Sequence, residues 1–111
     1  MDTRSKTVRL GSKIVHVSGE VDMNSAPKLR EKLRKTFDQK PVTVVLRLAD
    51  VPYMDSAGVA VLVEVLQWAK KEKILFVLAE PSAAVRAVIE MARLSRFFVI
   101  TDDAETSLPG S

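Results

Sequence analysis

Two short apolar runs, 42–48 and 74–79, alternate along the chain with longer segments whose apolar residues recur at helical spacing. The first run is rich in β-branched residues and the second is apolar throughout, which is typical of strands buried on both faces. Helical segments begin near Pro27, after Gly58 and at Pro81-Ser82. Strands that alternate with helices in this order favour a mostly parallel sheet built with right-handed crossovers.

Further strands are expected at both ends of this alternating region. The segments 7–10 and 14–17 flank Gly11-Ser12, which suits a two-residue hairpin turn because glycine accepts positive φ angles. Residues 97–100 form a last short strand or a loop, and the polar segment 101–111 is expected to fray. We predict an α/β fold in one domain, 1–111, with a core of about 7–100, a mixed sheet of four to five strands and a flexible tail, 101–111.

Composition narrows the classes of protein. The 111 residues suit one globular domain, because 47% of them are hydrophobic and 28% are charged. The absence of cysteine rules out disulfides and thiolate metal sites. No apolar run approaches the roughly 20 residues that span a bilayer, and the charged N-terminus lacks the apolar segment of a secretory signal. We therefore expect a cytoplasmic protein without direct membrane insertion.

The net charge of +3 raises the question of nucleic-acid binding. The basic residues between 28 and 35 are interleaved with Glu31 and with leucines at helical spacing. This pattern is typical of a solvated helix face, and neither zinc-ligand spacing nor an RNA-binding aromatic pattern accompanies it. We expect no nucleic-acid partner.

The residues that could support catalysis are isolated from one another. His16 is the only histidine and lies in a predicted strand, and no cysteine or second histidine accompanies it to form a metal site. Ser56 lacks the Gly-x-Ser-x-Gly elbow of a hydrolase nucleophile, and no glycine-rich phosphate loop is present. No combination of nucleophile, base and oxyanion donors can be assembled. The sequence predicts neither an enzyme, nor a metal site, nor a cofactor.

The helix after Gly58 carries apolar residues on two opposite sides. Spacing of 100° per residue groups one set of apolar side chains on a core face: Val59, Leu62, Val63, Leu66 and Ala69. Val61, Val65 and Trp68 fall on the opposite side. Either a neighbouring helix covers this second stripe or it is exposed for a partner. We predict a surface for partner binding or self-association there, because aromatic anchors of this kind dominate interfaces.

The loop before this helix, Asp55 to Gly58, allows a structural and a functional interpretation. Asp55 or Ser56 can cap the helix, and Gly58 can provide a close backbone approach or an unusual turn angle. A phosphate on Ser56 would be tolerated by the free N–H groups at a helix start. It would also place about −2 charge beside an apolar partner face, near Asp55 and Asp22, and could release the partner.

Several motifs occur in the order and spacing of one known family. They are Ser18-Gly19-Glu20-Val21-Asp22, Ala26-Pro27-Lys28-Leu29, the strand Val42 to Leu48 leading into Met54-Asp55-Ser56-Ala57-Gly58, Val59 to Val65, and Pro81-Ser82 with Val85 to Leu94. With these residues the chain resembles the STAS family, the sulfate-transporter and anti-sigma-factor-antagonist domains, over about residues 7–100. The resemblance implies a non-catalytic STAS fold with three to four helices mainly on one side of the sheet.

Stand-alone bacterial members of this family that the chain resembles are anti-sigma factor antagonists. In them a serine or threonine before the second helix is phosphorylated by an anti-sigma factor kinase, and the unphosphorylated form binds that kinase. The resemblance thus implies a phosphoprotein of bacterial signalling and transcription regulation. It assigns phosphorylation to Ser56, with Asp22, Asp55 and Gly58 as neighbours of the phosphosite.

Two positions depart from the antagonist pattern. Many antagonists carry a second hydroxyl residue where Ala57 stands, and a second glycine near Ala60. In this respect the chain is similar to the STAS subunit of Mla-type phospholipid-transport ABC systems, which binds a cytoplasmic ATPase without phosphorylation. That function is the alternative. For the oligomeric state we expect a monomer or a weak dimer.

Overall fold

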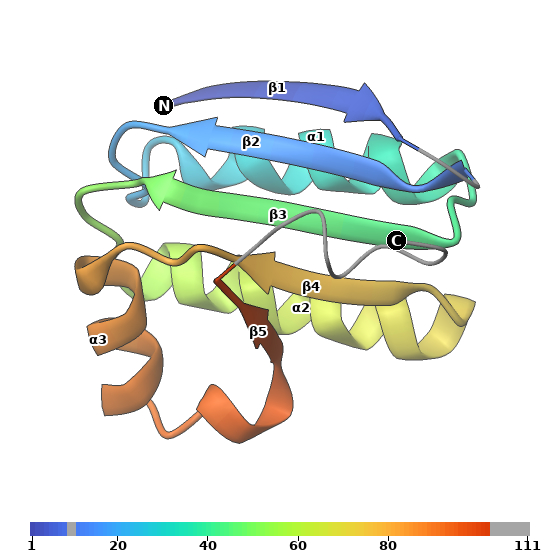
Figure 1. The fold of residues 1–111 in the computed structure, drawn as a ribbon. Coiled ribbons are helices and arrows are strands. Elements are labelled where there is room, and N and C mark those ends of the chain that lie inside the picture. The colour runs from blue at the N-terminus through green and yellow to red at the C-terminus, as the bar shows by residue number, and fades with distance from the viewer. Residues whose placement is uncertain (9–10, 103–111) are drawn as a thin grey trace.

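A five-stranded mixed sheet forms one layer of the molecule, as the computed structural model shows for residues 1–8 and 11–102 (Figure 1). The strands lie in the order β1-β2-β3-β4-β5. β1 is antiparallel to β2, and every other neighbouring pair is parallel. The strand bounds are β1 Asp2–Thr7, β2 Lys13–Ser18, β3 Thr43–Asp50, β4 Leu75–Ala79 and β5 Val99–Thr101.

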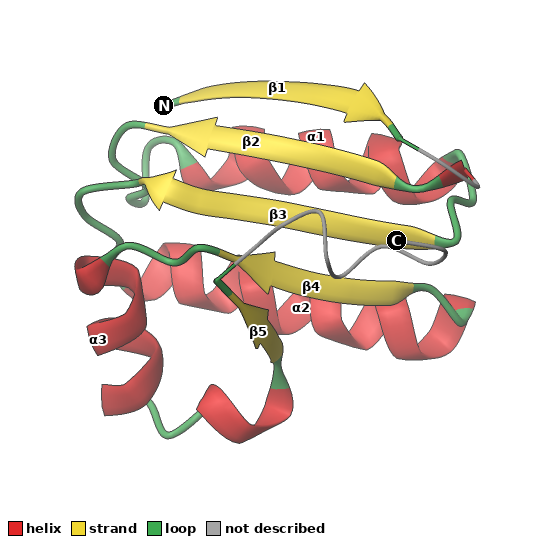
Figure 2. Ribbon diagram, in the orientation of Figure 1, coloured by secondary structure: helices red, strands yellow, loops and turns green. Residues whose placement is uncertain are grey.

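Helices form the second layer. Their bounds are α1 Ala26–Asp38, α2 Ser56–Glu72 and α3 Ala83–Met91, and a short 3-10 helix, Ser95–Phe97, precedes β5. From β2 onward each crossover adds the next strand on the same side of the sheet, so crossovers of one hand place their helices on one face. Figure 2 shows α1 and α2 together behind the sheet. The predicted mixed sheet, with helices mainly on one side, is confirmed.

The core lies between these two layers. Inward side chains of β2 and β3 meet fully buried residues of α1, namely Leu29, Leu33 and Phe37. The other face of the sheet carries a smaller buried set, Ile14, Val45, Val77 and Ala79. β3 and β4 are therefore buried on both faces, which explains their nearly continuous apolar sequences.

The first strand differs from the prediction. It spans Asp2–Thr7 rather than 7–10, and residues 9 and 10 lie outside the described residues. Pairing with β2 ends at Thr7 opposite Lys13, so the predicted two-residue turn at Gly11-Ser12 is wrong. The sequence pattern did not predict β1 because this strand is almost wholly polar and exposed. Polar side chains are expected on an edge strand, since they protect it from aggregation.

The remaining boundaries are close to the predicted ones. Pro27 lies in the first turn of α1, and Ser82 caps α3 by accepting the Val85 N–H at 3.2 Å. The last strand begins at Val99, two residues later than predicted, because the 3-10 helix occupies Ser95–Phe97. Of the predicted tail, Thr101 ends β5, and 103–111 lie outside the described residues.

The second apolar stripe of α2 is covered, contrary to the prediction that it is open. Val61 is only 7% exposed, Val65 is fully buried, and both belong to the main core. Trp68 is half-buried and meets the ring of Phe37 edge-on, with a centroid distance of 5.9 Å. The stripe is enclosed because α1 packs beside α2 in the same layer, which is the alternative that the sequence had left open.

Candidate functional site at the start of helix α2

The loops that follow β2 and β3 are joined at one edge of the sheet. Val21 donates its N–H to the Tyr53 carbonyl at 2.9 Å, and Asp55 donates its N–H to the Val21 carbonyl at 3.1 Å. These bonds form an isolated parallel bridge between Val21 and Met54. The carboxyl ends of two neighbouring parallel strands thereby bring the Asp22 loop next to the start of α2.

Asp55 caps α2 and also holds the neighbouring loop. Its Oδ1 accepts the backbone N–H groups of Ala57 at 2.9 Å and Gly58 at 3.3 Å. Its Oδ2 accepts the N–H of Met23 at 3.2 Å. The sequence had left the cap open between Asp55 and Ser56, and the structure assigns it to Asp55.

Ser56 is therefore not needed to start the helix. It is the first residue of α2, and its side chain is exposed. Within residues 1–8 and 11–102 its hydroxyl makes no hydrogen bond. A free hydroxyl at the positive end of a helix dipole can react with, or contact, another protein without breaking an internal contact.

Asp22 organises the adjacent loop. Its Oδ1 accepts the N–H groups of Asn24 at 2.9 Å and Ser25 at 3.0 Å. These backbone hydrogen bonds, from Ser25 first and Asn24 second, lower the pKa of the Asp22 carboxyl below its usual value. Asp22 thus stays ionised at neutral pH and adds negative charge to the edge that carries Ser56.

Gly58 permits the close approach of this loop to the core. A Cβ atom at this position would lie 2.6 Å from Cγ of Met54 and 2.9 Å from Cγ1 of Val21. Both distances are far shorter than an ordinary van der Waals contact. The predicted close approach is confirmed, and the first turn of α2 depends on the missing side chain.

The interface between α1 and α2 closes the side of α2 that carries Trp68. The Arg34 guanidinium lies 4.4 Å from the Trp68 ring centroid and donates to Glu72 at 2.8 and 2.9 Å. Hydrogen bonding to Arg34 lowers the pKa of Glu72, and hydrogen bonding to Arg30 lowers that of Glu64. These contacts consolidate the helix layer. Val61, Val65 and Trp68 therefore line the inside of that layer, and the exposed stripe expected there does not exist.

Two exposed apolar side chains near Ser56 were missed by the sequence analysis. Met23 is 73% exposed and follows Asp22, while Tyr53 is 49% exposed and precedes Asp55 by two residues. Both lie in the two joined loops. Their position next to the aspartates of predicted loops could have indicated them, because large apolar side chains in surface loops often contact a partner.

His16, on β2, has polar neighbours on both adjacent strands, Arg4 on β1 and Asp50 on β3. Its Nε2 lies 2.7 Å from Oδ2 of Asp50, and its Nδ1 lies 3.4 Å from the Arg4 guanidinium. In the part of the chain that the structure describes, no cluster of histidine and acidic side chains could hold a metal ion. No described helix is both long and apolar enough to cross a membrane.

The comparisons with known proteins agree with this architecture. A model of the STAS domain matches residues 3–107. The chain belongs to the STAS domain family. The anti-sigma-B factor antagonist of Listeria monocytogenes is 32% identical to this STAS domain over 90 residues, which cover 78% of the chain and 68% of the relative.

Two further proteins are similar to this STAS domain. The anti-sigma-B factor antagonist of Bacillus subtilis is 43% identical over 58 residues, and the match spans about half of each protein, 52%. The crystal structure of an anti-sigma factor antagonist from Mycobacterium paratuberculosis superposes with a TM-score of 0.86 at 25% identity, covering 96% of this chain and 89% of that one. These names describe antagonists rather than enzymes, in agreement with the predicted absence of catalysis.

Proposed function

We propose that this STAS domain is an anti-sigma factor antagonist that binds an anti-sigma factor with serine kinase activity and is released when that kinase phosphorylates Ser56. The observation that carries the proposal is the Ser56 side chain, exposed and without a hydrogen bond within the described residues. It starts a helix that another residue, Asp55, caps. The antagonist relatives support the same class of partner.

The partner surface comprises the joined loops and the first turns of α2. Met23 and Tyr53 offer apolar area, and Ser56 and Ala60 lie on the exposed side of α2. This surface replaces the stripe of Val61, Val65 and Trp68, which α1 covers. An apolar rim around an exposed hydroxyl suits a partner that both binds the surface and modifies it.

Phosphorylation would act through charge alone. The kinase transfers the γ-phosphoryl group of ATP to Oγ of Ser56, which loses its proton, and ADP leaves. The product carries about −2 charge at neutral pH. The N-terminus of α2 tolerates that charge, whereas a docked partner would have to desolvate it beside the carboxylates of Asp55 and Asp22. Because Asp55 is the cap, the domain keeps its fold while the partner is released.

Ser56 is the only serine or threonine between Asp50 and Gly58. The position after it, where many antagonists have a second hydroxyl residue, is Ala57, whose N–H is bound by Asp55. A kinase that acts on this loop therefore has Ser56 as its one aliphatic hydroxyl. The named relatives point to antagonists rather than to the transporter subunit, which we do not propose.

The test is a native pull-down from the source cells with wild type, Ser56→Asp and Ser56→Ala, with bound proteins identified by mass spectrometry. We expect wild type and Ser56→Ala to retain an anti-sigma factor kinase and Ser56→Asp to lose it by about tenfold or more, which corresponds to about 1.4 kcal/mol. The captured kinase, purified and given ATP, should phosphorylate wild type and leave Ser56→Ala unmodified.

Ser5→Asp is the matched control, because Ser5 is also exposed but lies on β1 at the far edge of the sheet. It should retain the kinase like wild type. Equal capture by wild type and Ser56→Asp, or phosphorylation of Ser56→Ala, would contradict the proposal. Capture of an ABC ATPase by both forms would establish the transporter alternative instead.

A further inference from the structure

Arg93 and Arg96 differ from most other arginines of the described chain in having no carboxylate partner. Arg30, Arg34, Arg47 and Arg86 each form an ion pair with a glutamate or an aspartate. Within residues 1–8 and 11–102, Arg93 and Arg96 form none. Both lie in the segment that leads from α3 to β5, Arg96 within the 3-10 helix, so two positive charges without a carboxylate partner among the described residues are close together there.

The two arginines line one depression together with Ser95. Its volume is about 350 Å³. Arg93 has a φ angle of 58°, and the adjoining N–H of Leu94 donates to the Ile89 carbonyl at 3.0 Å. This left-handed residue ends α3 and fixes the direction in which the chain continues. The depression is thus built on an ordered helix terminus.

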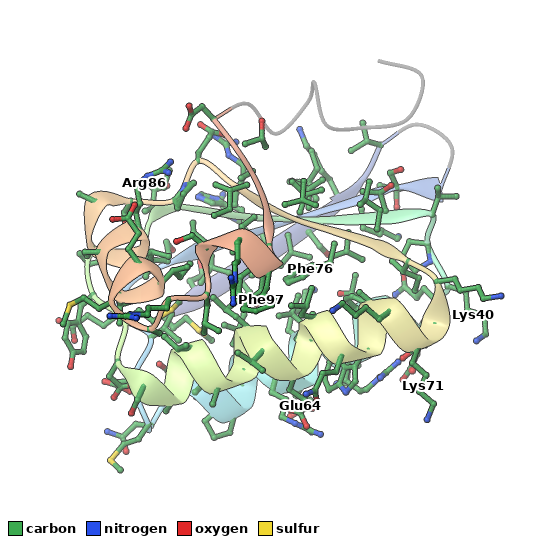
Figure 3. The ribbon with its side chains drawn as sticks, turned by 90° about the horizontal axis from the view of Figure 1, so that it is seen from below. Lys40, Glu64, Lys71, Phe76, Arg86 and Phe97 are labelled. Atoms are coloured by element: carbon green, nitrogen blue, oxygen red, sulfur yellow. The ribbon has the colours of Figure 1, made fainter. Side chains whose placement is uncertain are left out.

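An apolar groove lies beside the last residue of the 3-10 helix, Phe97. It has a volume of about 210 Å³ and is lined mainly by apolar side chains of α2, β4 and β5, with Lys70 at its margin. Leu75, Phe97 and Val99 in its wall are each close to half exposed. Figure 3 shows Phe97 and Phe76 close together above α2, and both line the groove.

Arg96 connects the two features, because its guanidinium lies 4.9 Å from the centroid of the Phe97 ring. The groove is smaller than the roughly 300–1,000 Å³ of small-molecule sites, but it suits a single large side chain. Arginines beside such a groove favour carboxylates, which they can bind in a bidentate manner. The charge and the apolar area together define the chemistry of the occupant.

We propose that this α3–β5 surface, formed by Arg93, Ser95, Arg96 and the groove around Phe97, docks a segment of a partner protein in which an apolar side chain is flanked by acidic residues. The apolar side chain enters the groove, and the carboxylates pair with Arg93 and Arg96. The groove residue Leu66 follows Ser56 by ten residues of α2, about 15 Å. The surface is therefore separate from the phosphorylation site and does not depend on the proposed function.

The test is a titration of the ¹⁵N-labelled full chain, followed by NMR, with the acetylated and amidated hexapeptide Asp-Asp-Leu-Phe-Asp-Asp. We expect saturable shifts confined to amides of residues 66–76 and 93–99. The double variant Arg93→Asn/Arg96→Gln should weaken binding by about tenfold. Asparagine is chosen at position 93 because it tolerates a positive φ angle.

The control variant is Lys35→Gln/Lys40→Asn, which removes the same charge from the last turn of α1 and from the second residue after that helix. Lys40 has a φ angle of 53°, which matches that of Arg93. It should bind the peptide like wild type. Absence of shifts, equal weakening by both double variants, or equal binding of a peptide with lysines in place of the aspartates would overturn the proposal. Shifts caused by a thymidine oligonucleotide and not by the acidic peptide would also overturn it, because the ligand would then be a nucleic acid.

Discussion

The two halves of α2 differ in how far the rest of the domain covers them. Around Trp68 the helix is enclosed: an aromatic ring lies between Phe37 and the guanidinium of Arg34, and ion pairs close the margin. At Ser56 the same helix is exposed, and Asp55 caps its first turn, although Gly58 in that turn is buried. The difference is that buried apolar residues mark the packed half of the helix, whereas the open half, which we propose as the partner site, carries a hydroxyl that makes no hydrogen bond within the described residues.

The largest expected effect lies in the enclosed half. Trp68→Ala should lower the free energy of unfolding by about 3 kcal/mol, because it removes the ring that fills the contact between α1 and α2. Gln67→Ala, at the exposed neighbouring position, should change it by less than about 0.5 kcal/mol. Urea unfolding followed by circular dichroism measures both. Similar small effects for the two variants would mean that Trp68 is not part of the packed layer.

A smaller loss is expected where the open half touches the core. Gly58→Val should cost about 2 kcal/mol, because its side chain would collide with Met54 and Val21. Ala60→Val, on the exposed side of the same helix, provides the control with the same change toward a β-branched residue. The same unfolding experiment applies. Equal stabilities of the two variants would show that the first turn of α2 can move away from the core.

The Asp55 cap of α2 should contribute less to the free energy of unfolding than the two preceding sites. Asp55→Ala removes the acceptor of the Ala57 and Gly58 N–H groups and should destabilise the domain by about 1 kcal/mol. Asp55→Asn retains an acceptor oxygen and should lose only part of that. The local effect is measured by hydrogen exchange of the Met23 and Ala57 amides, and this exchange should be faster in Asp55→Ala than in wild type. Unchanged exchange would argue against the double role of Asp55.

Acid should protonate two carboxylates that are held by different interactions: Glu72, in the enclosed half of α2, and Asp22, in the loop next to the open half. The lowered pKa values of Glu72 and Asp22 mean that each stabilises the fold above its ordinary pKa, 4.5 and 3.8, and loses that contribution as the pH falls through the lower folded value. Stability should therefore decline below about pH 4.5, and less steeply in Glu72→Gln and in Asp22→Asn.

Salt separates the two contributions. At 1 M salt the Debye length is about 3 Å, so the ion pair of Glu72 with Arg34 should weaken, whereas the backbone hydrogen bonds to Asp22 should not. The part of the pH dependence of the unfolding free energy that Glu72→Gln removes should be smaller in high salt. The part that Asp22→Asn removes should be the same at both salt concentrations. Unfolding curves between pH 2 and pH 6 at two salt concentrations provide the measurement, and equal salt effects on both parts would contradict it.

Periodicity predicted the buried elements well. The runs at 42–48 and 74–79 correspond to β3 and β4, and the leucines of α1 lie in the core, because burial forces a repeating apolar pattern. β1 lacks that pattern, since it is an exposed edge strand held by backbone bonds to β2. The periodicity of α2 predicted which side of the helix carries Val61 and Val65. It could not predict that α1 packs against that side.

The candidate site shows the same division. Asp55, Ser56 and Gly58 could be grouped from the sequence because they are adjacent, and Asp22 was added to them as a neighbouring charge, an assignment that the family resemblance also implies. The contact of Met23 with Asp55 depends on the bridge between Val21 and Met54, which joins loops more than 30 residues apart in the chain. Pairings of that kind leave no local pattern in a single sequence.

The sequential order of the five strands has a consequence for how the domain is assembled. Each strand is added beside the one that precedes it in the chain, and no strand has to enter between two that are already paired. Most strand contacts therefore close loops of one crossover, which keeps the entropic cost of each step modest. The chain can build its sheet from the N-terminal edge outward while the later strands are still being synthesised. Because α1 precedes α2 in the chain, the half of α2 that carries Trp68 can pack against α1 as soon as α2 has formed.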